Sequence, residues 1–255
     1  MQSYCLDYYY LFEKLHVIHQ MHQASNKRDP SQKYSARWHH ELLDFVGSEI
    51  DVIKRHHPNI YVIYLTLKML EDRDDSYLKM LIEFLGQTIR KMPDDKLRHH
   101  FSYAVSYCIS KINSGDERFR KFALDLYKKM DQLGLLTIDG SIMDSDFSNV
   151  VNISISEKEL DYAEDFAERY REQIVPEFAK DAYSLAKAKI LYFHGKYDEM
   201  FRLLGDVEYR DPNYYINSKL LTARAYADKR EREGSRYIIE NLKQYGRMNS
   251  EISEV

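Results

Sequence analysis

Hydrophobic residues recur at spacings of three and four along almost the whole chain, which is the period of an amphipathic helix. Polar stretches, several with Pro or Gly, interrupt the pattern and mark turns. The pattern predicts about twelve helices. They are 4–24, 34–55, 59–71, 76–92, 94–113, one ending near 133, 147–155, one ending near 172, and four more, the last at 231–248. No segment predicts a convincing strand. "LLTIDGSI" at 135–142 could pair briefly as a hairpin, but a loop is favoured.

One unit, at about 179–212, carries a compact motif. Its first helix contains the small residue Ala188, where a partner helix is expected to approach closely. A turn of the form Gly-x-Tyr-Asp-Glu follows at 195–199, and Met200 and Leu204 then lie on the core stripe of the second helix. Pro212 opens the next helix in its first turn. The motif resembles the tetratricopeptide repeat (TPR), a helix–turn–helix unit of about 34 residues.

The next unit, at about 213–247, keeps this register. Leu221 and Thr222 occupy the Leu-small pair, and Gly234 occupies the small position of the second helix. "DKRERE" replaces the Gly-x-Tyr turn. The resemblance implies an all-α fold, a right-handed α-α superhelix of about six antiparallel helix pairs, built as one domain over residues 1–255. Upstream, "SEKE" at 156–159 matches a capping box that would begin a helix with the Ser156 side chain.

A second resemblance covers more of the chain. The segments "YAVSYCISKINSGDERF", "DLYKKMDQLGLL", "FSNVVNI", "LDYAEDFAERY" and "GKYDEMFRLLGDVEYRDPNYY" are similar to a family of long, uncharacterised bacterial TPR-like proteins. Members of that family generally continue further, which leaves open that this chain is a fragment. We therefore expect an exposed apolar strip on the last helix, at Tyr237, Ile238, Leu242 and Tyr245. The resemblance implies the fold and the expectation of a scaffold, and it carries over no particular activity.

Charge and composition narrow the classes of function. The formal net charge of −4 disfavours a nucleic-acid binder. The run "DKREREGSR" at 228–236 alternates in sign and is interpreted as a solvated face, with a phosphate or RNA contact as the alternative. No apolar run is long enough to cross a membrane. Cys5 and Cys108 form no disulfide framework, and with no signal peptide at the start they indicate a cytoplasmic protein.

Candidate catalytic and metal-binding residues are few. Glu13, His16, His19 and His22 lie at three-residue steps, but a di-iron bundle needs a second Glu-x-x-His, which the sequence lacks. Cys108 lies on an apolar stripe and is interpreted as a buried small hydrophobe. No nucleophile elbow, P-loop or dinucleotide motif occurs. We therefore expect no enzyme, no catalytic residues, no metal and no cofactor.

The expected function is a non-enzymatic scaffold that binds a peptide or partner protein along its concave face. The repeat register places on that face Leu185, Lys189, Tyr192, Ile216, Lys219 and Tyr226, together with Ala182 and Ala223. The alternative is a regulatory sensor module that binds a small ligand or peptide and signals to a missing domain. A homodimer formed through the exposed C-terminal helix also stays open.

Overall fold

The computed structural model describes residues 2–28, 39–72, 74–88 and 92–248. Within these ranges the chain forms thirteen α-helices and one 3-10 helix, and it has no strand beyond two isolated β-bridges. The prediction of an all-α fold is confirmed. Contacts divide the chain into two compact units, Met1–Gly115 and Asp116–Val255. Whether the chain is a single repeat domain stays a prediction.

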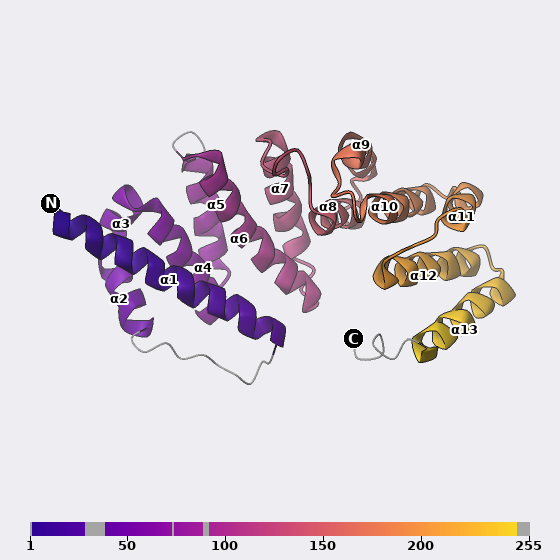
Figure 1. Ribbon diagram of the computed structural model, residues 1–255, viewed down its shortest axis with the longest axis horizontal. Coiled ribbons are helices and arrows are strands. Elements are labelled where there is room, and N and C mark those ends of the chain that lie inside the picture. The colour runs from indigo at the N-terminus through magenta and orange to yellow at the C-terminus, as the bar shows by residue number, and fades with distance from the viewer. Residues whose placement is uncertain (1, 29–38, 73, 89–91, 249–255) are drawn as a thin grey trace. The chain divides into compact units, whose positions relative to one another are not determined.

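The N-terminal unit is organised around its most apolar helix. The helices of this unit are α1 (Gln2–Arg28), α2 (His39–Ser48), α3 (Ile50–His56), α4 (Pro58–Asp72), α5 (Ser76–Thr88) and α6 (Asp94–Asn113). Helix α4 contacts the other five (Figure 1). It buries eight of its fifteen residues. The segment predicted as one helix at 34–55 is interrupted at Glu49, whose backbone leaves helical geometry; residues 34–38 lie outside the described ranges.

The C-terminal unit is a succession of paired helices. Its elements are α7 (Phe119–Gln132), α8 (Asp144–Ser156), α9 (Leu160–Tyr170), the 3-10 turn η1 (Arg171–Gln173), α10 (Ala179–Phe193), α11 (Tyr197–Gly205), α12 (Pro212–Asp228) and α13 (Arg232–Met248). Helices α8, α10 and α12 each pack against the helix that follows in sequence (Figure 1). They also pack against one another, α8 on α10 and α10 on α12.

Four helices of this unit end in the same way. Gly134, Lys158, Gly195 and Arg230 all have positive φ, between 63° and 74°. After each of them the next amide bonds back to a carbonyl five residues earlier, as in Lys196 N–H to Leu191 O at 2.9 Å and Glu231 N–H to Tyr226 O at 2.8 Å. This is the Schellman termination, which reverses the chain while satisfying the last carbonyls of the helix. It explains the Gly of the 195–199 turn and shows that Arg230 serves in place of a Gly.

The same termination corrects the predicted capping box at Ser156. Helix α8 continues through Ser156, whose hydroxyl donates to the Asn152 carbonyl at 2.9 Å. Lys158 then adopts φ 64°, and α9 begins at Leu160 with no side-chain cap from Glu159. The Ser is therefore the end of one helix and not the start of the next. The local sequence was compatible with Ser156 either beginning a helix or ending one.

The loop favoured at 135–142 is instead the brief hairpin that was the alternative. Ile138 and Ser141 exchange two backbone hydrogen bonds, at 2.8 and 2.9 Å. Asp139 and Gly140, between them, both have positive φ, which is the geometry of a type I′ turn. Ile142 then forms a parallel bridge with Ile174, so the turn is held against the segment after η1.

Small residues mark where helices of the unit meet. Ala188 is fully buried in a hydrophobic cluster with Leu185, Tyr192, Leu221 and Ala225, which joins α10 to α12. The close contact expected at Ala188 is consistent with this burial. At the other end of the unit, no apolar residue of α13 with a described side chain is fully buried, and Tyr237 is 64% exposed. Of the four residues expected to form an exposed apolar strip, Tyr237 is exposed, while Ile238, Leu242 and Tyr245 are half-buried.

Candidate partner-binding surface

Two of the six residues predicted to bind a partner lie in the core. Leu185 and Tyr192 are 5% and 6% exposed and belong to the cluster between α10 and α12. The Tyr192 hydroxyl donates to the Asp228 carboxylate, and burial together with this bond raises the pKa of Tyr192 to about 12. Both side chains already have partners within the unit. A ligand reaching them would have to open the α10–α12 contact.

Lys189 lies between α8 and α10. Its Nζ donates to Asn152 Oδ1 at 2.8 Å, and burial lowers the pKa of the ammonium group. No carboxylate forms an ion pair with Lys189 within the described residues. The lysine is therefore a partly desolvated cation, held by an amide at the junction of two helices of the row.

The other three predicted residues are half-buried, and two of them are tied to the α13 side of α12. The Tyr226 ring stacks on Phe201 of α11, with ring centroids 4.6 Å apart, and also meets Gly234 of α13. The Lys219 ammonium lies 5.4 Å from the Tyr215 ring, which contacts Tyr245 of α13. Ile216 is half-buried as well. The side chains of Lys219 and Tyr226 are therefore occupied by contacts within the unit.

The exposed face of α12 is shifted by one residue from the predicted face, which contained Ile216 and Lys219. Asn213, Asn217, Leu220 and Arg224 recur at spacings of four, three and four, so they share one stripe, and all four are exposed. Leu220 is 51% exposed, and Phe193 at the end of α10 is 47% exposed. The Arg224 guanidinium lies 5.2 Å from the Tyr192 ring and 6.0 Å from the Phe193 ring. We call these four residues with Phe193 the open stripe.

The turn before α12 holds the open stripe in position. Asp211 caps the helix, accepting hydrogen bonds from the amides of Asn213 at 2.7 Å and Tyr214 at 3.2 Å. The buried Asp181 carboxylate of α10 accepts from the amides of Arg210 and Asp211, at 2.9 and 3.2 Å. Since Pro212 adds a fixed φ at the first helical position, the start of α12 is fixed relative to α10. The stripe is therefore a preorganised surface.

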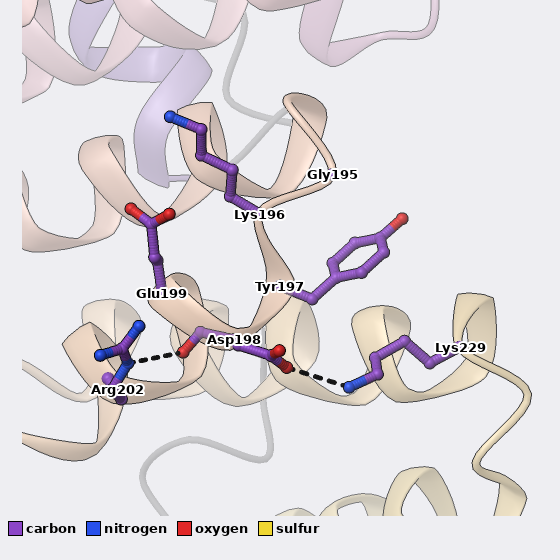
Figure 2. Close-up of a pocket in the computed structure, with 7 residues that line it drawn as sticks. All are labelled: Gly195, Lys196, Tyr197, Asp198, Glu199, Arg202 and Lys229. Atoms are coloured by element: carbon purple, nitrogen blue, oxygen red, sulfur yellow. Dashed lines mark hydrogen bonds and ion pairs between the residues drawn. The ribbon is translucent and has the colours of Figure 1, made fainter.

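A shallow hollow of about 310 Å³ surrounds the Gly-x-Tyr-Asp-Glu turn (Figure 2). Asp198 pairs with Lys229, the residue after α12, at 3.1 Å, and Arg202 donates to the Asp198 carbonyl at 3.4 Å (Figure 2). Lys196 and Glu199 extend to one side of the turn. The ion pair links the turn to the end of α12. These contacts account for the turn motif as a structural device that joins consecutive helix pairs.

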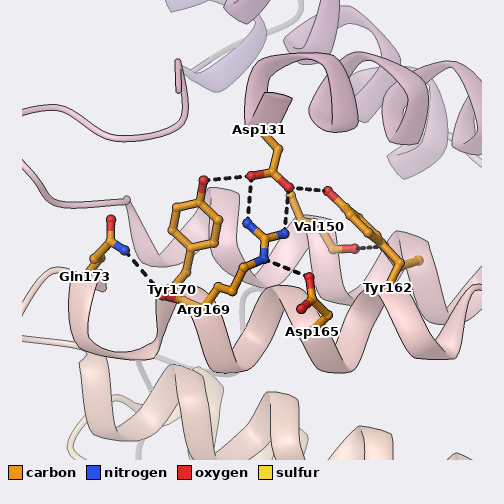
Figure 3. Close-up of polar contacts among 8 residues, drawn as sticks. Asp131, Val150, Tyr162, Asp165, Arg169, Tyr170 and Gln173 are labelled. Atoms are coloured by element: carbon orange, nitrogen blue, oxygen red, sulfur yellow. Dashed lines mark hydrogen bonds and ion pairs between the residues drawn. The ribbon is translucent and has the colours of Figure 1, made fainter. Parts of the chain in front are cut away.

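A second polar cluster joins α7 to α9. The Asp131 carboxylate accepts two hydrogen bonds from the Arg169 guanidinium, at 3.0 and 2.8 Å (Figure 3). The hydroxyls of Tyr162 and Tyr170 donate to it at 2.9 and 2.8 Å. Burial opposes ionisation, but these donors outweigh it and lower the pKa of Asp131. The Asp131 carboxylate thus accepts four hydrogen bonds, all from α9. We interpret the cluster as a structural link between α7 and α9.

Two of the histidines in the described part of the chain lie around one tyrosine of the N-terminal unit. His16 and His99 approach Tyr103, whose hydroxyl lies 3.5 Å from His16 Nδ1. Side chains of His22 and Cys5 lie outside the described residues. Burial raises the pKa of Cys108 to about 12, which opposes its use as a nucleophile. The described residues contain no group of three or more His, Cys, Asp or Glu side chains placed to hold a metal ion.

Comparisons with known proteins identify no relative. No protein-family model matches the chain, no curated protein matches its sequence, and no solved structure matches its fold. Among the described helices, none combines the length and the apolar content needed to cross a bilayer. Functional inference therefore rests on the geometry of this chain.

Proposed function

We propose that the chain is a TPR-like helical-repeat protein that binds a partner protein or peptide without catalysing a reaction. The observation that carries the proposal is the open stripe, where Leu220 and Phe193 are exposed side chains on the row α8–α10–α12. Helices that pair in sequence and also stack along one row are the pattern of an α-solenoid. Such repeats use the exposed face of their first helices to bind extended segments. A right-handed superhelix belongs to the same proposal.

The side chains of the open stripe support a particular chemical class of partner. Leu220 and Phe193 offer apolar contact, Asn217 retains its amide oxygen as an acceptor, and Arg224 offers a guanidinium beside an aromatic ring. Amides of this kind hydrogen-bond to the backbone of an extended peptide, and Arg binds carboxylates in a bidentate manner. The partner we propose is an extended peptide segment with an apolar side chain followed by an acidic group. A buried free thiol at Cys108 is compatible with the cytoplasmic location that we propose with it.

The proposal is tested by comparing affinity capture from native lysate with the wild-type chain and the Leu220→Asp variant. A charge at Leu220 should abolish recovery of the partner, because it places a carboxylate at the apolar centre of the contact. Ile138→Asp is the matched control, since Ile138 is 56% exposed in the same unit but lies on the hairpin turn. A partner retained by Leu220→Asp, or lost equally with Ile138→Asp, would contradict the proposal. Circular dichroism confirms that both variants are folded.

A further inference from the structure

A basic hollow of about 770 Å³ lies at the turn between α12 and α13. The residues that define it are Arg230, Arg232, Arg236 and Lys243 around the rim, with Ala227 and Ile239 among its lining residues. Arg230 is in the turn and Ala227 is at the end of α12, while the other four lie along α13. Side chains from three places in the sequence thus converge on one depression. We call this set the basic hollow.

The cations of the basic hollow have few carboxylate partners, unlike the paired cations elsewhere in the C-terminal unit. Lys187 pairs with Glu164 and Glu168, Arg169 pairs with Asp131 and Asp165, and Lys229 pairs with Asp198 and Glu231. Over the described part of the chain, by contrast, no ion pair involves Arg230, Arg232 or Lys243.

Arg236 is only weakly neutralised. The one carboxylate that lines the basic hollow, Glu240, is 4.0 Å from the Arg236 guanidinium, and both side chains are largely exposed. An exposed pair at this distance contributes little. The basic hollow therefore carries uncompensated positive charge in a chain whose formal net charge is −4.

The apolar part of the basic hollow suits a helix. Ala227 is exposed, and Ile239 is 41% exposed. Ala227 is two residues from Ala225, which belongs to the cluster facing α10, so it lies on roughly the opposite side of α12. In stacked helix pairs, that side of a pair receives the next helix. A hollow between two helices that combines two apolar side chains with several cations is complementary to an amphipathic helix with acidic flanks.

We propose that the basic hollow docks an acidic amphipathic helix of a partner protein. Apolar side chains of that helix pack on Ala227 and Ile239, and its carboxylates pair with Arg232, Arg236 and Lys243. The surface is separate from the open stripe, so the two sites are tested with different variants.

Binding is measured by fluorescence anisotropy with the full chain and a labelled synthetic peptide that presents leucine on one helical face and glutamate on the other. We expect saturable binding that weakens as salt is raised. The double variant Arg232→Glu, Arg236→Glu should lower affinity about tenfold, the change expected when two or three exposed ion pairs are lost. It should also gain affinity for the peptide in which lysine replaces glutamate. Arg202→Glu, an exposed arginine on α11, is the matched control.

Three results would overturn the proposal. The first is wild-type binding that does not distinguish the glutamate peptide from the lysine peptide. The second is a double variant that binds the glutamate peptide as the wild type does. The third is tighter binding of a single-stranded oligonucleotide or of anionic lipid vesicles than of the glutamate peptide. Because the substituted arginines are exposed, unfolding is not expected, and circular dichroism of each variant checks this.

Discussion

Gly234 of α13 lies so close to the Tyr226 ring of α12 that a β-carbon on Gly234 would stand 2.9 Å from Tyr226 Cδ1. The atoms it would meet are at the base of the ring, which is itself stacked on Phe201 of α11. The ring therefore has little freedom to move away. This contact explains why the second helix of the last pair carries a small residue at the position that the repeat register assigned to one.

Gly234→Ala should destabilise the C-terminal unit by about 1 to 2 kcal/mol, because the overpacking cost exceeds the gain in helix propensity. Gly246→Ala, on the same helix, is the matched control because nothing lies within 4 Å of a β-carbon there. It should be neutral or stabilise by up to about 1 kcal/mol. Hydrogen exchange of α12 and α13 in the full chain measures both changes. Equal protection in the two variants would refute the close packing.

Gly195→Ala should cost about 1 kcal/mol, because φ of Gly195 is 74° and a β-carbon is disfavoured in the left-handed region. Open space surrounds the position, so the cost is one of backbone conformation alone. Gly205→Ala, at the end of α11, also meets nothing within 4 Å and should not destabilise. Urea denaturation of the full chain compares the two. A loss in both variants would point to packing and against the termination geometry.

Asp131→Asn should destabilise the C-terminal unit by about 2 kcal/mol, because it weakens a bidentate pair and leaves two tyrosine hydroxyls poorly satisfied. Asp165→Asn removes the more exposed carboxylate from the same arginine and should cost less than about 0.5 kcal/mol. The pKa of Asp131 is lowered in the folded state, so its contribution is present above the unfolded value of 3.8 and is lost as the pH falls below it. Denaturation measured across this acidic range in wild type and Asp131→Asn should therefore converge.

The N-terminal unit should lose stability on mild acidification through His100. Burial, with the charges of His99 and Lys96, lowers the pKa of His100 from 6.5 to about 4. Because the unfolded chain binds the proton more readily, the contribution of His100 is complete above 6.5 and declines as the pH falls toward 4. A shift of this size corresponds to a loss of about 3 kcal/mol at full protonation.

Hydrogen exchange of α4 and α6 at neutral and acidic pH tests this expectation. The His100→Gln variant should show a smaller acid-induced loss of protection than the wild type, even though it is less stable at neutral pH, since it removes the hydrogen bond to Asn59. The exposed residue His40 provides the control: His40→Gln should retain the wild-type acid response. An unchanged response in His100→Gln would assign the acid sensitivity to other groups.

Sequence periodicity alone determined the helical class and most helix positions. The prediction at 94–113 coincides with α6, because Pro93 precedes its start and Ser-Gly follows its end. The repeat register predicted that Ala188 and Gly234 lie where neighbouring helices approach closely. Ala188 is fully buried, and Gly234 lies against the Tyr226 ring. Such features depend on neighbours within a few residues, where backbone propensity and side-chain spacing dominate. The predictions at Glu49 and Ser156 were wrong, because the local sequence there was compatible both with a helix interior or start and with a helix end.

Only the tertiary structure decided which stripe of α12 is exposed. Tyr226 and Leu220 belong to the same helix and are six residues apart. Tyr226 packs on α11 and α13, whereas Leu220 is 51% exposed. A shift of one residue rotates a helix by about 100°, and apolar content cannot resolve it when tyrosine suits both core and surface. The convergence of Arg230 and Lys243, and the approach of Arg169 to Asp131, likewise depend on how helices pack, because the residues are separated along the chain and meet only in the folded unit.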